Sequence, residues 1–329
     1  MKNFDLLVVP VDGSSAARRG IDFAIDLAKR EGAAVDVCSV VDEIAVILPL
    51  AEGALCDPSL IMETIEHAAD ENVKFALSLL REAGIAAEGT VLRGNPAAEI
   101  DAFVRRRVAD AIVLGTNGRS TIERWFIGGV TLAMLRTSDV PVITVHADDT
   151  LNAGPMLVAI DDSPASLAAL DCAIERAGCS SATLALLHVF EERRVERYAQ
   201  ALGLHSRDAR RRALADAEDT VTGAADRARA AGISCSTDMQ FGSPGATIVS
   251  AAQRYASSSI AIGTHGRGEL GRLLFGSVAD EVVRAARVAV YVVHHQRSAA
   301  SVTPSSEHPN SRTAKIPAFV GRAQNEVRT

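Results

Sequence analysis

Residues 115–130 read GTNGRSTIERWFIGGV, and residues 263–278 read GTHGRGELGRLLFGSV. The two segments share seven of sixteen residues at an offset of 148. Upstream of each, residues 6–24 (LLVVPVDGSSAARRGIDFA) are matched by residues 156–173 (MLVAIDDSPASLAALDCA). This period is far longer than the roughly 20 to 50 residues of a solenoid repeat. The chain is therefore predicted to contain one type of globular domain twice.

Hydrophobic periodicity in the first copy alternates between short apolar runs and amphipathic stretches. Alternating strands and helices predict parallel strands joined by right-handed crossovers, with ligands bound beyond the strand C-termini where the strand order reverses. The expected fold class is α/β: two tandem doubly wound, Rossmann-like domains, each a five-stranded parallel sheet with helices on both faces. The predicted strands of the first copy are 6–11, 34–41, 87–93, 111–115 and 142–146, and its predicted helices are 14–31, 57–83, 96–107 and 129–137.

Domain boundaries follow from breaks in this pattern. Domain 1 is expected over residues 1–146 and domain 2 over 156–295, joined by a polar linker over 147–155. Residues 296–329 lose all periodicity and are rich in Ser, Thr, Pro and Asn, so a disordered tail is predicted. A partner-binding segment within this tail, around residues 316–320, is the alternative.

The composition limits which kinds of partner and location are expected for this chain. The chain has 34 Lys and Arg against 41 Asp and Glu, a formal charge of −7, with no long basic block, so nucleic acid is not an expected partner. No apolar run is long enough for a signal peptide or a membrane span. The five cysteines include no C-x-x-C pair and are expected to be reduced thiols, which favours a cytoplasmic protein.

A phosphate site is indicated by the glycines of the second copy. Gly263 and Gly266 follow a predicted strand and let backbone approach a ligand closely. Gly276 and Ser277 open a helix whose free N–H groups and dipole favour an anion. In the alternative interpretation the first glycines serve turn geometry, and Ser277 is an N-cap that forms a capping-box-like pair with Asp280.

A domain that opens V-x-x-D-x-S and carries G-x-x-G-(nine)-G-[ST] after its fourth strand resembles the universal stress protein family, and the resemblance covers residues 6–146 and 156–294. In the ATP-binding branch of that family, the loop glycines and the Ser or Thr hold phosphates and ribose. The aspartate after the first strand and backbone near the end of the second hold ribose and adenine. For domain 2 the resemblance implies a site at Asp161, Val189, Gly263, Gly266, Gly276 and Ser277. Independently of the resemblance, the loop residue Arg267 is a candidate phosphate contact, with a solvated side chain as the alternative.

Domain 1 matches this pattern less completely. It departs at Gly129, where the family has Ser or Thr, so a hydroxyl donor to phosphate is missing. Thr131 is not expected to replace it, because two residues at about 100° each turn its side chain some 200° around the helix. Nucleotide binding is therefore expected mainly in domain 2. The matching residues of domain 1 are Asp12, Val40, Gly115, Gly118 and Gly128, with Gly129 at the variant position.

The resemblance implies a tandem, stress-related regulatory or signalling protein that binds ATP, with Mg²⁺ left open and ATP hydrolysis slow at most. No catalytic residue or metal ligand is predicted. His265 has no carboxylate or nucleophile placed to work with it, and adjacent histidines at a strand end, His294 and His295, point to opposite faces. The alternatives are an adenylate-forming or ATP-hydrolysing enzyme on the same fold, and a nucleotide-free interaction module. The sequence contains neither H-x-G-H nor S-G-G-x-D-S nor a P-loop.

The last strand of each copy is a candidate interface. Residues 142–145 and 288–293 are apolar and β-branched. In this family the last strand commonly pairs across a dimer interface. The two segments are therefore expected to pair within one chain as a pseudo-dimer, with a further homodimer and a protein partner of the tail left open.

Overall fold

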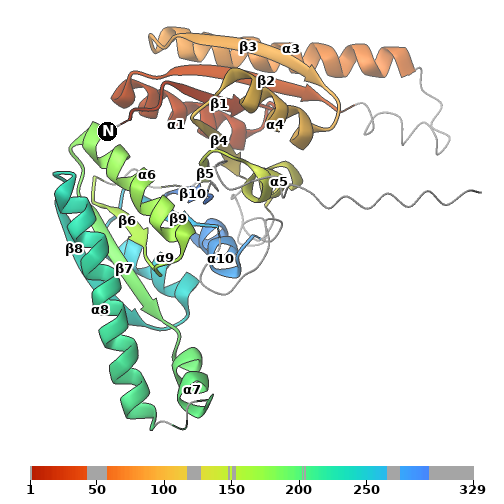
Figure 1. Cartoon of the computed structure of the whole chain (residues 1–329). Coiled ribbons are helices and arrows are strands. Elements are labelled where there is room, and N and C mark those ends of the chain that lie inside the picture. The colour runs from red at the N-terminus through yellow and green to blue at the C-terminus, as the bar shows by residue number, and fades with distance from the viewer. Residues whose placement is uncertain are drawn as a thin grey trace, which may run out of the picture. The chain divides into compact units, whose positions relative to one another are not determined.

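The computed structural model describes residues 2–42, 58–116, 127–146, 149, 153–201, 203, 205–264 and 275–295 (Figure 1). The predicted linker lies largely outside these ranges and the predicted tail beyond His295 lies entirely outside them. In domain 1 every predicted element is present, with ends within one residue of those expected. The elements are β1 (Leu6–Pro10), α1 (Ser15–Glu31), β2 (Ala34–Val41), α3 (Pro58–Glu82), β3 (Ala87–Arg93), α4 (Pro96–Arg107), β4 (Ala111–Thr116), α5 (Gly129–Thr137) and β5 (Val142–His146).

Domain 2 repeats this alternation of strand and helix. Within the described ranges, no helix is long and apolar enough to cross a membrane. The elements are β6 (Met156–Ala159), α6 (Pro164–Ser180), β7 (Leu184–Phe190), α7 (Glu192–Ala201), α8 (Ser206–Ala230), β8 (Cys235–Phe241), α9 (Pro244–Arg254), β9 (Ser259–Gly263), α10 (Ser277–Ala285) and β10 (Ala289–Val293).

Side-chain caps and left-handed residues fix the helix ends. Ser14 accepts a hydrogen bond from the Ala17 N–H and Ser163 accepts one from the Ser166 N–H, which satisfies N–H groups that the helix leaves free. Gly84 follows α3 and Gly232 follows α8, with φ of 76° and 80°. This left-handed backbone stops the helix without steric cost because glycine lacks a Cβ.

The strands form one ten-stranded sheet in the order β3-β2-β1-β4-β5-β10-β9-β6-β7-β8. Neighbouring strands are parallel within each domain, and β5 and β10 pair in the antiparallel sense. Tyr291 lies opposite Ile143 in that pair, which confirms the predicted pairing of the two last strands. Because the central pair is antiparallel, the strands of domain 1 and domain 2 run in opposite directions. The C-terminal ends of their strands therefore point to opposite sides of the sheet.

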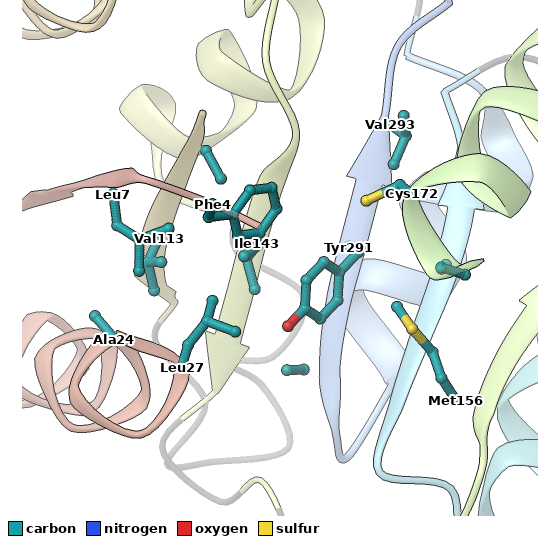
Figure 2. Packing of buried hydrophobic residues seen from close by; sticks show 14 of the residues in the cluster. Phe4, Leu7, Ala24, Leu27, Val113, Ile143, Met156, Cys172, Tyr291 and Val293 are labelled. Atoms are coloured by element: carbon teal, nitrogen blue, oxygen red, sulfur yellow. The ribbon is translucent and has the colours of Figure 1, made fainter. Parts of the chain in front are cut away.

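Helices cover both faces of the sheet. One buried cluster joins α1, α3, α6 and α8 to the sheet, and the other joins α4, α5, α9 and α10. Figure 2 shows the first cluster continuing from Leu27 and Ile143 in domain 1 to Tyr291 and Met156 in domain 2. Burial raises the pKa of the Tyr291 phenol. The two domains therefore share a continuous apolar core along the β5–β10 pair.

A buried ion pair reinforces this contact. The Arg176 guanidinium on α6 donates to the Glu31 carboxylate on α1, and the two side chains are 6% and 3% exposed. Arg176 also donates to the Lys2 carbonyl and lies 3.6 Å over the Phe4 ring. The N-terminal segment, α1 and α6 are thus held at one charged centre.

Candidate functional site

A cavity of about 350 Å³ lies in domain 1 beyond the C-terminal ends of β1, β2 and β4. The strand order reverses here, since β1 lies between β2 and β4, so the cavity occupies the position that a doubly wound fold favours for ligands. Its walls also come from α1, α3, α4 and α5. The polar side chains that line it belong to Asp12, Ser14, Ser39, Asn72 and Thr131.

Three of the domain 1 residues predicted from the motif meet at this cavity: Asp12, Val40 and Gly115. Gly128 and Gly129 open α5, and the next two residues of that helix line the cavity. Gly118 lies outside the described residues. The structure therefore brings the strand-end and helix-start parts of the predicted site together.

The strand-end aspartates have one engaged oxygen each. Asp12 Oδ1 accepts the Ser14 N–H at 3.0 Å, and Asp161 Oδ1 accepts the Ser163 N–H at 3.1 Å and the Ser163 hydroxyl at 2.6 Å. The serines cap their helices, and each also engages one oxygen of the aspartate two residues before it. Within the described ranges Oδ2 of each aspartate accepts no hydrogen bond, so one oxygen can receive a ligand hydroxyl.

The first glycine of each motif packs a strand against a helix. A Cβ placed on Gly115 would lie 1.7 Å from the Ala16 carbonyl oxygen, and one on Gly263 would lie 2.5 Å from the Ala165 carbonyl carbon. No side chain fits at either position. These glycines let the first turns of α1 and α6 approach the strand ends that border the site.

The last glycine of each motif is the N-cap of the following helix. Gly128 precedes α5 and Gly276 precedes α10, and their carbonyls accept the first helical hydrogen bonds, at 2.9 Å from Leu132 and Asp280. The N–H groups before those two residues have no helical acceptor, and the helix dipole adds to their attraction for an anion. Both helix starts therefore suit a phosphate oxygen.

Ser277 is the first helical residue rather than the N-cap, so the capping-box interpretation is wrong. Asp280 instead accepts two hydrogen bonds from Arg284, at 2.8 and 2.9 Å. Gly276 donates its N–H to the Thr264 carbonyl at 2.9 Å, which ties the helix start to the end of β9. The structure thus brings Gly263 close to Gly276 and Ser277, as the motif predicts. The remaining residues of this loop, Gly266, Arg267 and His265 among them, lie outside the described ranges.

Besides the helix cap Ser14, three polar cavity residues were not predicted as site residues from the sequence. Asn72 of α3 lies with Oδ1 2.6 Å from where a Gly13 Cβ would stand, and Ser39 lies one residue before Val40. Thr131 lines the cavity although helix rotation alone turns it away. Helical Cα–Cβ bonds tilt toward the N-terminus, so a third-position side chain leans back over the helix start.

Other reactive side chains near the site have ordinary structural roles. Burial, with a smaller effect of Asp36, raises the pKa of the Cys38 thiol to about 12, so this cavity residue stays protonated at neutral pH and is a poor nucleophile. His188, beside Val189 on β7, has Nδ1 2.7 Å from the Ile160 carbonyl oxygen. The described residues include no cluster of three or more metal-ligating side chains.

Comparison with known proteins agrees with this fold. The model of the universal stress protein family matches residues 3–146 and 153–294. A crystal structure of a universal stress protein from Archaeoglobus fulgidus superposes with a TM-score of 0.68 over 88% of this chain and 98% of that chain. At 22% identity this likeness speaks for the fold alone.

Sequence relatives carry the same family name. A universal stress protein of Mycolicibacterium smegmatis is 24% identical over 87% of this chain and 96% of its own length. One from Mycobacterium tuberculosis is 30% identical over 56% of this chain, and the match spans 61% of that protein, less than two thirds. One from Methanocaldococcus jannaschii is 32% identical over 42% of this chain and 80% of its own length. Since the family model matches each half separately and covers most of the chain, the chain belongs to the universal stress protein family and carries two of its domains in tandem.

Proposed function

We propose that this chain binds ATP, mainly in domain 2, and acts as a stress-related regulatory or signalling protein rather than as an enzyme with a dedicated reaction. Binding of adenine nucleotides is typical of the family. The observation that carries the proposal is the start of α10. There the Gly276 N–H is tied to the end of β9, and Ser277 adds a hydroxyl to the free N–H groups of the first turn.

Each part of the nucleotide has a proposed partner in domain 2. Phosphate oxygens are received by Ser277 and the free N–H groups of the first turn of α10, together with Gly266 and Arg267 of the motif. Gly276, whose N–H donates to the Thr264 carbonyl, leaves room for their close approach. The unengaged oxygen of Asp161 accepts a ribose hydroxyl, and backbone at Val189 borders the adenine. Mg²⁺ is held in proteins by one or two carboxylates and substrate phosphates, so the ion would enter with ATP and not at a site of its own.

Domain 1 supplies the corresponding groups with one change. Asp12, Val40 and Gly115 border its cavity, and α5 begins with Gly129 in place of a hydroxyl residue. A hydrogen bond to a charged group is worth about 1.5 to 3 kcal/mol, so this difference favours domain 2.

The test is direct. Mass spectrometry of nucleotide released from freshly purified protein should detect ATP, and calorimetric titration should give one dominant site. Gly276→Val places a side chain where phosphate must approach, and Ser277→Glu places a carboxylate there, so each should weaken ATP binding strongly while leaving the melting temperature nearly unchanged.

Gly128→Val, the equivalent change in domain 1, is the matched control and should leave the dominant site intact. Unchanged ATP affinity in folded Gly276→Val and Ser277→Glu would remove the assignment to α10.

A further inference from the structure

Another cavity, of about 100 Å³, lies between the two domains and shares no described lining residue with the cavity of domain 1. Its walls come from the C-terminal half of α1 and from α6, β10 and the starts of β6 and β9. We propose that this interdomain pocket binds a small, uncharged aromatic molecule that carries one hydrogen-bond acceptor. The proposal goes beyond nucleotide binding, because the site proposed for ATP in domain 2 lies at the opposite ends of those strands. The residues on which the argument depends are Phe23, Leu27, Met156, Arg176, Ser258 and Tyr291.

The internal repeat indicates what such a pocket can hold. The first strands of the two copies are related by an offset of 149 residues, so Phe4 before β1 corresponds to Ala153 before β6. The Phe4 side chain is buried, its ring lies under the Arg176 guanidinium, and its N–H donates to the Glu31 carboxylate at 2.8 Å. Ala153 is exposed. An aromatic side chain is therefore seated at this position in domain 1 and is missing in domain 2.

The interdomain pocket is the counterpart of the place where Phe4 is seated. Ile143 and Tyr291 pair directly and are themselves equivalent at the offset of 148, so an approximate two-fold axis relates the domains. Three residues hold the N-terminal segment, and the residue equivalent to each of them lines the pocket. The equivalent pairs are Arg176 and Leu27, Glu31 and Ser180, and Asp110 and Ser258. The pocket is therefore the space that a ring would occupy if domain 2 began as domain 1 does.

Apolar side chains form walls that suit an aromatic ring. Phe23 and Tyr291 have ring centroids 6.4 Å apart in an edge arrangement, and both line the pocket. Figure 2 shows Tyr291 between Leu27 of domain 1 and Met156 of domain 2, which line it as well. The volume of about 100 Å³ is close to the ~150 Å³ of a cavity that takes up benzene, and well below the ~300 Å³ at which pockets for larger ligands begin. The size therefore fits a single ring and not a nucleotide.

Arg176 supplies a hydrogen-bond donor to the same pocket. The residue is 5% exposed, and its terminal nitrogens donate to Glu31 and Lys2, whereas its Nε has no hydrogen-bond partner in the part of the chain that the structure describes. A buried donor left without an acceptor is costly, so a ligand that brings an acceptor gains stability. Among the described lining residues, the charges of Arg30 and Arg176 are balanced by those of Asp26 and Glu31. This balance favours an uncharged ligand, because an ion would lose its hydration without a counter-charge.

Phenol is the probe for this pocket, because it combines one ring with one acceptor oxygen, and toluene has the same shape without the acceptor. Methionine-methyl NMR of the full chain follows binding, since Met156 lines the pocket and Met156→Leu identifies its signal. We expect phenol to shift the Met156 signal with a Kd on the order of 1 mM. Toluene should bind about 3- to 10-fold more weakly, because it leaves the Arg176 Nε without an acceptor.

Ala153→Phe supplies the missing ring from the chain itself. This variant should abolish the phenol-dependent shift of the Met156 signal and raise the melting temperature by about 2 to 4 °C, since apolar surface becomes buried. Ala153→Ser adds no ring, is the matched control, and should change neither property. Phe4→Ala empties the filled position, so it should lower the melting temperature. Phenol should then raise the melting temperature of Phe4→Ala more than that of the unmodified chain.

Three results would overturn the inference: no phenol-dependent shift of the Met156 signal, a shift that persists in Ala153→Phe, or toluene that binds as tightly as phenol. Each of these results leaves the proposed binding of ATP untouched. Conversely, a chain that binds no adenine nucleotide would still be expected to bind phenol here, so the two proposals fail separately.

Discussion

At the scale of single residues, the glycines of one motif serve unlike purposes. Gly115 is required by packing, because any Cβ would overlap the backbone of Ala16. Gly129 has open space around it and occupies an ordinary first helical position. The same residue type is thus obligatory at one end of the motif and replaceable at the other.

This contrast predicts two different effects of alanine. Gly115→Ala should lower the free energy of unfolding by about 3 kcal/mol, since overpacking against backbone forces a shift of α1. Gly129→Ala should leave stability unchanged or raise it by up to about 1 kcal/mol, because alanine favours helix. Urea denaturation followed by circular dichroism measures both. Similar stabilities for the two variants would refute the packing role of Gly115.

Sequence reasoning predicted the cavity residues that belong to a motif and missed those that the fold adds. Asp12, Val40 and Gly115 lie at or just beyond strand C-termini, and parallel strands end on the same side of the sheet, so their convergence was predictable. Asn72 lies within a long helix whose rotation the sequence leaves open. Thr131 lines the cavity, which the rotation angle alone does not predict because it neglects the tilt of helical side chains toward the N-terminus.

At the scale of elements, Asp110 fastens the N-terminal segment to the start of β4. Its Oδ2 accepts the N–H groups of Asp5 and Leu6 at 2.8 and 3.0 Å, and Oδ1 accepts the Lys2 ammonium at 2.8 Å. Partial burial alone would raise the pKa of this carboxyl, but the hydrogen bonds outweigh burial and lower its pKa below 3.8. The ionised form is therefore the one that stabilises the fold.

Asp110→Asn should cost about 1 to 2 kcal/mol of unfolding free energy at pH 7, mainly through the two N–H bonds, because the Lys2 side chain is well exposed. A lowered folded pKa gives stability that is present above pH 3.8 and is lost as pH falls through the folded value. The difference in unfolding free energy between Asp110→Asn and the unmodified protein should therefore become smaller in acid. Urea denaturation at pH 7 and at successive pH values below 3.8 measures this difference. A difference that stays constant with pH would contradict the role of the Asp110 charge.

Element boundaries were predictable because local chemistry sets them. Ser14 caps α1, Pro96 is the first residue of α4, and Gly84 has left-handed backbone beyond the end of α3. Because the domain is repeated, each of these boundary signals occurs twice in the sequence at a fixed offset. The first residue of α10 was harder to predict. Glycine and serine both suit an N-cap, and the sequence does not show whether Gly276 or Ser277 occupies that position.

At the scale of the whole molecule, the Glu31–Arg176 pair links α1 of one domain with α6 of the other. Glu31→Gln removes the buried counter-ion of Arg176 and leaves only the partly exposed Glu175 carboxylate, 3.6 Å away. Removing one partner of a buried pair typically costs about 3 to 5 kcal/mol. Glu31→Leu combined with Arg176→Met removes both charges and should cost less. Chemical denaturation of both variants tests this, and a double variant less stable than Glu31→Gln would contradict it.

The pairing of β5 with β10 came from family resemblance and apolar strand composition, whereas its register and its place at the centre of a ten-stranded sheet came from the structure. No local pattern encodes which residues of two distant strands face each other. Tyr291 opposite Ile143 is a property of the assembled sheet.

Because the two paired domains belong to one chain, their sequences can diverge from each other. Two separate chains that met through their last strands would come apart on dilution, whereas partners in one chain meet at an effective concentration fixed by the linker. Identical subunits must also change together with every mutation. Here the two copies are free to differ, as Gly129 and Thr131 differ from Ser277 and Ala279. Under the proposed nucleotide binding, the two sites would differ in affinity, and one polypeptide would respond over a wider range of ligand concentration than a symmetric pair could.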